Sequence, residues 1–266
     1  MLLAIDVGNT NTVFALFDKK NEEKLIHSWR CKTESARSGD EYAVFLNQLF
    51  ILENISWKSI CDVVISSVVP DANFHLTKFC EKYLSKRPLC VDARRAGVEL
   101  SLDQPGEVGA DRLVNASAII KHYPLPAIVV DFGTATTFDV IDSNRVYQGG
   151  VIAPGIQLSI DALAEHAAKL PQIAIRKPKS SIGKNTAEAM QSGMYWGYIG
   201  LIEKIIDNIT SDLLSGGETN KPHVIATGGL ASLYAKDTSM IDVVDNDLIF
   251  KGLLEINRRH KKAKSK

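Results

Sequence analysis

The chain has 266 residues, of which 45% are hydrophobic and 23% charged, values that fit one large folded domain or two small ones. Lysine plus arginine equals aspartate plus glutamate, at 31 each, so no net charge attracts nucleic acid or an anionic membrane surface. The four cysteines form no CxxC pair, which argues against a zinc site and favours free thiols in a reducing compartment. The pattern contains neither a secretion signal nor an apolar stretch of membrane-spanning length, so we expect a cytoplasmic protein without membrane partners.

The first residues predict a β-hairpin. Leu2–Asp6 and Thr12–Phe17 are short, branched and apolar, and Gly8-Asn9 stands between them. Leu25–Cys31 is a candidate third strand. The rest of the first half predicts a helix over residues 41–53 capped by Asp40, a buried strand over Asp62–Val69, helical spacing over Phe74–Leu84 and a helix over Asp111–His122.

The second half begins with the same pattern, because Ile128–Asp131 and Thr136–Ile141 predict strands on either side of Gly133-Thr134. The next predicted elements are a strand near Val146–Ile152, a helix over Ile156–Leu170 and a loop over Pro171–Lys184. A long helix from Thr186 to Leu214 follows, with Asn185 as N-cap and Glu188 at capping-box spacing. The last predicted elements are a strand over Val224–Ala226 and a helix over Asn246–Arg258. We expect the basic run Arg258–Lys262 to be a solvated C-terminal end.

The two glycine turns predict an internal duplication. The segments Asp6–Thr12 and Asp131–Thr137 share an aspartate, a glycine and a closing threonine at the same offsets, and each lies between two apolar strands. The helix that ends at His122, before Pro124, marks the natural boundary. We therefore predict two domains, residues 1–122 and 123–266.

The turn from Asp6 to Thr12 has the chemistry of a phosphate loop. Glycine and short polar residues let backbone N–H groups approach a phosphate, and an aspartate at the strand end is placed to hold Mg²⁺, directly or through water. An ordinary Asn-rich hairpin turn is the alternative interpretation. No GxxxxGK[ST] pattern occurs, so a Walker-type nucleotide site is not expected.

The turn from Asp131 to Thr137 is the second candidate phosphate loop, and Thr227-Gly228-Gly229 is a third glycine turn after a strand, suited to close approach of an adenosine. Two such hairpins, one from each domain, would clamp a polyphosphate and its metal. Phosphoryl transfer depends mainly on positioning and charge neutralisation, so paired loops suit it.

Three glycine turns in this order resemble the superfamily of actin, the heat-shock ATPases, and acetate and sugar kinases. Within it, the chain resembles the type III pantothenate kinase family from Met1 to about Asn257. The motifs that carry this resemblance are Asp6-Val-Gly-Asn-Thr10, Pro105-Gly-Glu-Val-Gly-Ala-Asp-Arg112, Asp131-Phe-Gly-Thr-Ala-Thr136 and Gly149-Gly-Val-Ile-Ala-Pro-Gly155. The fold that it implies is α/β: two duplicated actin-like ATPase (ribonuclease H-like) domains, with mixed sheets flanked by helices and an ATP cleft between them.

The resemblance also implies a reaction and its residues. ATP and Mg²⁺ would phosphorylate pantothenate to 4′-phosphopantothenate, the first step of coenzyme A biosynthesis, in a homodimer that needs potassium or ammonium. Asp111 would be the general base and Asp131 the ligand of the monovalent cation, with Asp6 a further metal ligand. ATP would contact Asp6, Val7, Gly8, Asn9, Thr10, Asn11, Thr12, Val13, Thr134, Gly228 and Gly229. Pantothenate would contact Leu102, Gly109, Ala110, Asp111, Arg112 and Thr186.

Elementary chemistry is compatible with these roles. An aspartate is ionised at pH 7 and can accept the proton of an attacking hydroxyl, and the Arg112 guanidinium can form a fork to the pantothenate carboxylate. Both residues adjoin a predicted helix N-terminus, which favours anions. Leu102 stands where family members often carry an aromatic side chain, so the local contact at that position differs.

Two alternatives stay open at the level of the sequence. One is a kinase for another small alcohol or acid, which the nucleotide loops alone do not distinguish from a pantothenate kinase. The other is a non-catalytic ATP-binding regulator or assembly protein. The presence of Asp6, Asp111 and Asp131 together argues against the second, since a protein that only binds nucleotide needs no base.

Overall fold

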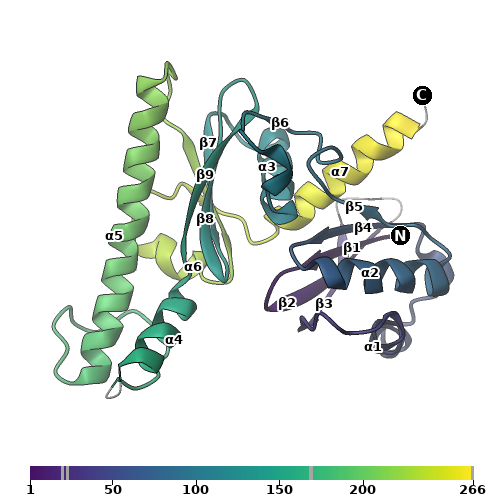
Figure 1. The fold of residues 1–266 in the computed structure, drawn as a ribbon, viewed down its shortest axis with the longest axis horizontal. Coiled ribbons are helices and arrows are strands. Elements are labelled where there is room, and N and C mark those ends of the chain that lie inside the picture. The colour runs from purple at the N-terminus through teal and green to yellow at the C-terminus, as the bar shows by residue number, and fades with distance from the viewer. Residues whose placement is uncertain (19–20, 22–23, 168–169, 265–266) are drawn as a thin grey trace. The chain divides into compact units, whose positions relative to one another are not determined.

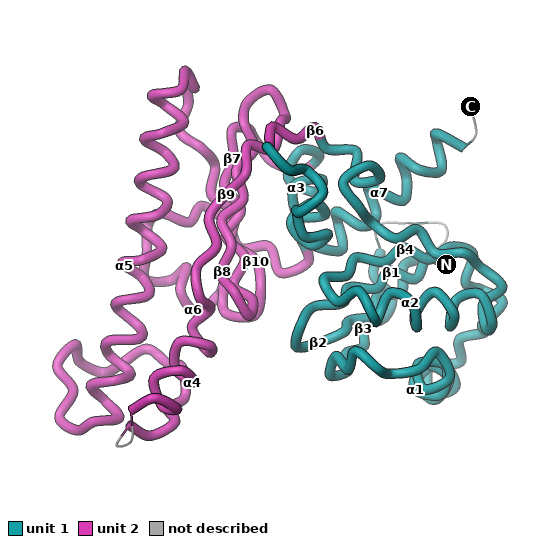
Figure 2. Tube along the Cα trace, viewed as in Figure 1, with its two compact units in different colours: residues 1–98, 103–121, 248–266 teal, residues 99–102, 122–247 magenta. Residues whose placement is uncertain are grey.

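The computed structural model describes residues 1–18, 21, 24–167 and 170–264. These residues form two compact units, each built on one mixed sheet (Figures 1 and 2). Unit 1 comprises Met1–Val98, Asp103–Lys121 and Leu248–Lys266, and unit 2 comprises Glu99–Leu102 and His122–Asp247. The predicted division at residue 122 puts the last helix in the second domain, whereas the structure puts it in unit 1.

The sheet of unit 1 has the strand order β3-β2-β1-β4-β5. Its strands are β1 Leu2–Val7, β2 Asn11–Phe17, β3 Leu25–Lys32, β4 Asp62–Ser67 and β5 Leu89–Cys90. β1 pairs antiparallel with β2 and parallel with β4, so β1 and β4 end at the same edge of the sheet. Buried apolar residues of β1, β2 and β4 pack against helices α1 Gly39–Leu52 and α2 Pro70–Phe79 to form the core of this unit.

The sheet of unit 2 has the order β11-β10-β7-β8-β9-β6, and its first five strands repeat the arrangement of unit 1 with one strand added at the edge. Its strands are β6 Glu99–Leu100, β7 Ala127–Phe132, β8 Ala135–Ile141, β9 Val146–Pro154, β10 His223–Gly228 and β11 Val243–Val244. Its core contains residues of helices α4 Ile156–His166, α5 Thr186–Ser215 and α6 Ala231–Tyr234. The repeated strand order supports the predicted duplication.

Several helix boundaries differ from the prediction. Ser38, not Asp40, caps α1, because the Ser38 side chain and that of Glu41 form a reciprocal capping box. α2 begins at Pro70, which fits the first turn of a helix since that position needs no N–H donor, and a π-helical turn, Cys80–Leu84, follows. α4 ends at His166, short of the predicted Leu170; residues 168 and 169 of that prediction lie outside the described part of the chain.

The long helix was predicted closely, and Asn185 is its N-cap, 2.9 Å from the N–H of Glu188. The Glu188 carboxylate accepts from the N–H of Lys184, whereas a reciprocal capping box would have it accept from the N–H of the N-cap, Asn185. Among the described residues, no helix has the length and apolar character needed to cross a bilayer.

The C-terminal helix α7 Leu248–Lys264 packs on unit 1. The prediction of a solvated basic tail was wrong for residues 258–261, which are half-buried, and correct for the exposed Lys262. Arg259 donates hydrogen bonds to the carbonyl of Gly97 and the hydroxyl of Ser117 in helix α3 Ala110–His122, while Lys261 lies 2.8 Å from Asp62. Contacts so distant in sequence leave no local signal, so the basic run resembled a free end.

Candidate active site

The first candidate phosphate loop lies at the carboxyl end of β1. The N–H of Gly8 donates to the carbonyl of Asn11 at 3.0 Å, which closes a tight turn with Asn9 and Thr10 exposed at its tip. Asp6 is half-buried at the strand end. The side chains of Val7 and Thr12, two of the predicted ATP-binding residues, are fully buried. At these two positions only the backbone can contact a ligand.

Thr33, which sequence reasoning missed, is the residue that ties this loop to the third strand. Its N–H donates to the carbonyl of Thr10 at 3.0 Å, and its hydroxyl donates to the carbonyl of Gly8 at 2.8 Å. A threonine just after a predicted strand carries no local signal of such a role. Only the pairing of β2 with β3 brings it to the loop.

Asp111 is in the same unit as the first loop, in the first turn of α3. A Cβ added to Gly109 would lie 2.6 Å from the Asp111 carboxylate and 3.6 Å from Val68. Val68 in turn donates its N–H to the carbonyl of Val7 at 3.1 Å, at the ends of β4 and β1. The structure therefore brings the carboxylate of Asp111 to the edge of the sheet from which the first loop emerges.

The surroundings of Asp111 disfavour its charged form. Burial raises the pKa of the carboxyl above its usual range, while the N–H of Arg112, 2.8 Å away, and the Arg112 guanidinium act in the opposite direction. The net effect is upward. A carboxylate that is kept from water and has a raised pKa is a stronger proton acceptor than an exposed one.

The second candidate phosphate loop joins β7 to β8 and is one residue shorter than the first. The N–H of Gly133 donates to the carbonyl of Ala135 at 3.1 Å, and Thr134 is exposed at the tip. In the strand pairing, Thr12 lies opposite Val7 and Thr136 lies opposite Phe132. The structural counterpart of Thr12 is thus Thr136, not Thr137 as equal sequence offsets predicted.

Asp131 and the third glycine turn lie together in unit 2. A Cβ added to Gly228 would lie 2.7 Å from both the Asp131 carboxylate and the carbonyl of Phe132. Gly228 also has a φ of +92°, which favours glycine, so these two oxygens approach the turn to a distance that only glycine permits. Carboxylate and carbonyl oxygens are the donors that hard cations prefer, and this donor set fits potassium or ammonium.

The remaining predicted substrate residues lie in different places. Gly109 and Ala110 form the start of α3 beside Asp111, and Arg112 is half-buried in the same turn. Leu102 belongs to unit 2, where it packs against the backbone of Gly149 in β9. Thr186 is exposed in the first turn of α5, the helix whose lower part lies beside α4 in Figure 1.

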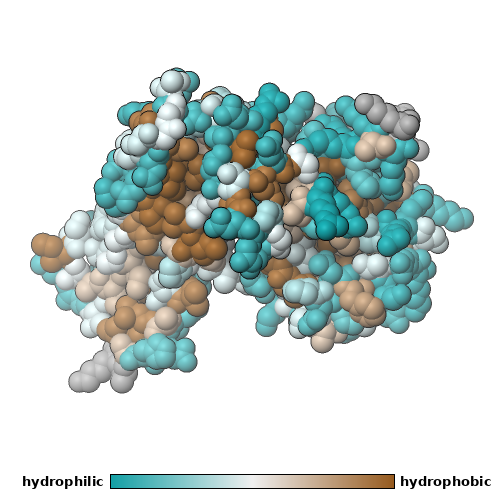
Figure 3. Space-filling view, turned by 45° about the horizontal axis from the view of Figure 1, so that its top comes forward, coloured by the Kyte–Doolittle hydropathy of each residue, from teal (hydrophilic) through white to brown (hydrophobic). Residues whose placement is uncertain are grey.

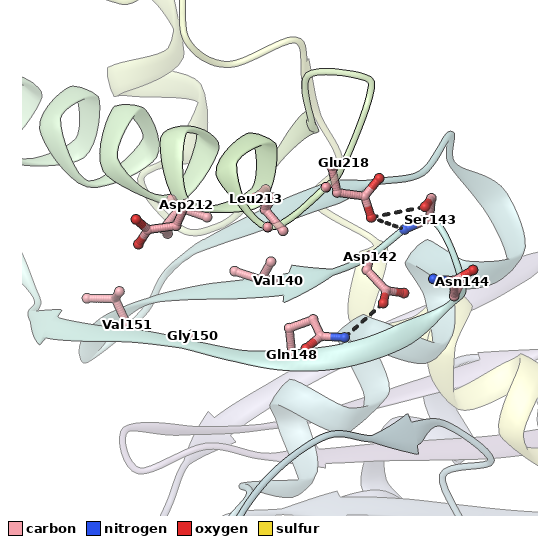
Figure 4. Close-up of a pocket in the computed structure, with 13 residues that line it drawn as sticks. Val140, Asp142, Ser143, Asn144, Gln148, Gly150, Val151, Asp212, Leu213 and Glu218 are labelled. Atoms are coloured by element: carbon pink, nitrogen blue, oxygen red, sulfur yellow. Dashed lines mark hydrogen bonds between the residues drawn. The ribbon is translucent and has the colours of Figure 1, made fainter.

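Unit 2 also contains a cavity of about 550 Å³ between the end of α5 and the β8–β9 hairpin (Figure 4). Its polar rim includes Glu218, which accepts from the N–H and hydroxyl of Ser143, and Asp142, which accepts from Gln148. None of the predicted site residues lines this cavity. We assign it no part in the site, because no predicted site residue lines it and the carboxylates of Glu218 and Asp142 already accept from neighbouring donors.

Among the described residues, no three His, Cys, Asp or Glu side chains gather into a metal-binding group. Mg²⁺ in phosphoryl-transfer enzymes is commonly bound by one or two carboxylates, several waters and the substrate phosphates. A single carboxylate at the end of β1, Asp6, matches that requirement, because the phosphates of a nucleotide would supply further oxygens.

Comparison with known proteins identifies relatives along nearly the whole chain. Residues 2–208 match the family described as type III pantothenate kinase. Proteins with this description are 49% identical over 266 residues in Paramagnetospirillum magneticum, covering 98% of each chain, and 46% identical over 269 residues in Caulobacter vibrioides, covering all of each. A further one, from Halalkalibacterium halodurans, is 44% identical over 261 residues, covering 98% of this chain and all of its own.

Solved structures share the fold at low sequence identity. A Campylobacter jejuni protein whose description names the Baf family of transcriptional activators has a TM-score of 0.61 at 19% identity and covers 98% of this chain and 99% of its own. An inorganic polyphosphate/ATP-glucomannokinase from Arthrobacter has a TM-score of 0.50 at 15% identity and covers 97% and 99%. Likeness at such identities concerns the fold alone.

Proposed function

The chain belongs to the type III pantothenate kinase family, and we infer that it transfers the terminal phosphoryl group of ATP to the primary hydroxyl of pantothenate. The product is 4′-phosphopantothenate, and the reaction is the first step of coenzyme A biosynthesis. The observation that carries this conclusion is the match to these kinases over almost the full length of both chains. The α/β fold with two sheets and flanking helices is that of the actin-like ATPases and sugar kinases.

Asp111 is the general base in this proposal. Its carboxylate accepts the proton of the pantothenate hydroxyl while the hydroxyl oxygen bonds to the γ-phosphorus and the bond from that phosphorus to the β,γ-bridging oxygen of ATP breaks. In a loose transition state the proton moves late, so the main task of the base is to orient the hydroxyl. The buried position of Asp111 beside the ends of β1 and β4 supports this role.

The two hairpin loops bind the nucleotide phosphates in this proposal. Backbone N–H groups of Asn9 and Thr10, at the exposed tip of the first loop, and the exposed Thr134 supply donors. Next to Gly228, Gly229 leaves space for the adenosine, because a Cβ there would meet nothing within 4 Å. When Mg²⁺ is bound, it neutralises part of the negative charge of the phosphates. Asp6 is the carboxylate that would hold it.

The pantothenate pocket begins at the N-terminus of α3. Gly109 and Ala110 offer a small surface beside the base, and Arg112 offers a guanidinium fork that matches the carboxylate of pantothenate. We propose that Leu102 and Thr186 also contact pantothenate, as the family resemblance implies. Both are at least partly accessible to a ligand.

We further propose that Asp131 and the carbonyl of Phe132 bind a monovalent cation, potassium or ammonium. The nearness of these two oxygens to each other at the Gly228 turn supports this assignment.

A homodimer is also part of the proposal. Figure 3 shows hydrophobic surface on the left of the view, over unit 2, and large exposed apolar side chains of that unit are Ile152, Leu158, Ile182, Trp196 and Leu214. Contiguous exposed apolar surface commonly marks an association site. ATP as substrate and four free cysteines favour the cytoplasm as the place of the reaction.

The direct test is an assay with pantothenate, ATP, Mg²⁺ and either potassium or sodium, in which mass spectrometry follows 4′-phosphopantothenate. We expect product with potassium and little with sodium. Asp111→Asn should lower kcat by roughly 10²- to 10⁴-fold while ATP binding persists. The matched control is Asp71→Asn, since Asp71 is the exposed first-turn carboxylate of α2 and should be dispensable. ATP binding without product under either cation would refute the assignment.

A further inference from the structure

The residue that follows the third strand has the same place in both repeats. Asn11 pairs with Lys32 in unit 1, and Ala135 pairs with Pro154 in unit 2, so Thr33 and Gly155 are structural counterparts. Each donates its N–H to the carbonyl at the tip of the adjacent loop. The distances are 3.0 Å from Thr33 to Thr10 and 3.1 Å from Gly155 to Thr134.

Beyond this shared bond, the two counterparts hold their loops in opposite ways. The Thr33 hydroxyl lies 2.8 Å from the carbonyl of Gly8 and 2.9 Å from the hydroxyl of Thr12, so one side chain joins both sides of the first turn. Gly155 has no side chain, and a Cβ there would lie 2.2 Å from the carbonyl of Thr134 and 2.7 Å from that of Gly133. The φ of Gly155 is −67°, so it is the close approach of the second loop that requires glycine here, not the backbone angle.

These bonds matter because a phosphate is attracted by N–H groups and repelled by carbonyl oxygens. In the first loop, the carbonyls of Gly8 and Thr10 accept from Thr33, and that of Asn11 accepts from Gly8. Engaged in this way, the carbonyls are held against the protein, and the loop cannot turn them toward a bound anion. Thr33 donates to two of these three carbonyls, so it can keep the loop in its phosphate-binding form.

We propose that Thr33 and Gly155 are positioning residues for the two nucleotide phosphate loops, Thr33 through its hydroxyl and Gly155 through the absence of a side chain. This rests on the proposed function, in which both loops bind ATP. Neither residue contacts the reacting atoms in this proposal. Each acts through the loop that it holds.

The test at Thr33 compares two substitutions. Thr33→Val keeps the shape but removes the hydroxyl, whereas Thr33→Ser keeps the hydroxyl. We expect Thr33→Val to raise the KM for ATP and the Kd of a non-hydrolysable ATP analogue roughly 3- to 10-fold, as loss of a hydrogen bond at the loop implies, and to leave the KM for pantothenate unchanged. Thr33→Ser should restore wild-type values. Thr219→Val, at an exposed position after α5, is the matched control.

The test at Gly155 is Gly155→Ala, which should weaken ATP binding more than Thr33→Val because loop backbone must move. Calorimetric melting of each variant separates a loss of stability from a loss of affinity. A Thr33→Val protein with a lower melting temperature but wild-type ATP affinity would overturn the positioning role, and so would a folded Gly155→Ala protein that binds ATP normally. If the wild-type protein itself binds no ATP, the proposed function fails as well, so the two failures are distinguishable.

Discussion

At the scale of single residues, Asp111 combines two properties that seldom occur together: a first-turn helix position, which favours a negative charge, and burial, which disfavours it. Burial is the larger effect, so the pKa is raised. The sequence predicts the helix position of Asp111, because Leu113 and the residues after it follow a helical pattern. It does not predict the burial, which arises where α3 meets the end of β4 through Gly109 and Val68.

The raised pKa of Asp111 predicts a pH dependence of catalysis. The proposed base works only when it is deprotonated, so this proposal predicts that kcat/KM falls as pH falls, with an apparent pKa above the value of about 3.9 that an unperturbed aspartate has. Initial rates between about pH 4.5 and 8 would measure this limb. An acid limb at or below the ordinary aspartate value would contradict the burial of the working carboxylate.

The same shift predicts a stability change with a definite sign. A folded-state pKa above the unfolded one means that ionisation of Asp111 opposes folding, so its contribution to stability is fully present below the unfolded pKa and is lost as pH rises through the folded pKa. Asp111→Asn should therefore have a higher melting temperature than wild type at pH 7. The gain should vanish near pH 3.5, and a variant that is less stable at pH 7 would show that the hydrogen bond from Arg112 outweighs desolvation.

The residues that hold the loops in place were only partly predictable from the sequence. Asp6, Gly8, Asp131 and Gly228 are recognisable because the motif around each is local. Thr33 is not, since its partners Gly8 and Thr12 lie 25 and 21 residues away in the chain. The counterpart of Thr12 was misassigned for a related reason: hydrogen-bond register, which sequence offsets do not reveal, sets it at Thr136.

At the scale of elements, the close contact of α7 with α3 joins the end of the chain to the helix that carries Asp111. A Cβ on Gly252 would lie 2.1 Å from the carbonyl of Val114, so the two helices approach to a distance that only glycine permits. The prediction of a last helix was correct. Its packing partner was unpredictable, because Gly252 and Val114 are far apart in the sequence.

Gly252→Ala should destabilise the protein by about 1–3 kcal/mol, since the helices must separate to admit the methyl group. Gly200→Ala is the matched control, because Gly200 is also a helical glycine but a Cβ there meets nothing within 4 Å. It should stabilise by about 0.5–1 kcal/mol through helix propensity alone. Urea unfolding of both variants measures the difference, and equal effects would refute the close contact.

Short elements and caps show the other limit of prediction at this scale. Strands β5, β6 and β11 span two residues each, too few for any alternation of apolar and polar side chains to be visible. Ser38 and Asp40 are both good capping residues, and only the reciprocal bond with Glu41 decides between them.

At the scale of the whole molecule, the sequence predicts the duplication well. It does not predict which segments of the chain belong to which unit. The orders β3-β2-β1-β4-β5 and β9-β8-β7-β10-β11 are the same arrangement used twice, as the paired glycine turns predicted. The return of α7 to unit 1 and the inclusion of Glu99–Leu102 in unit 2 were not predicted. Both depend on contacts between segments that are distant in the chain.

The expected homodimer is a prediction about the whole molecule. Sedimentation velocity at micromolar concentration should give a mass twice that of the 29.2 kDa chain. Burial of exposed apolar side chains such as Ile152 and Leu158 on association is the physical reason. A monomer at every concentration at which the enzyme is active would contradict it.

The central claim is that pantothenate is the acceptor, and competition between acceptors tests it most directly. The protein would be incubated with ATP, Mg²⁺ and potassium in an equimolar mixture of pantothenate, glycerate, acetate, glucose and N-acetylglucosamine, and every phosphorylated product would be measured by mass spectrometry. The account predicts that 4′-phosphopantothenate forms at the expense of all others. A sugar phosphate or acyl phosphate as the main product would contradict it and leave only the shared kinase fold.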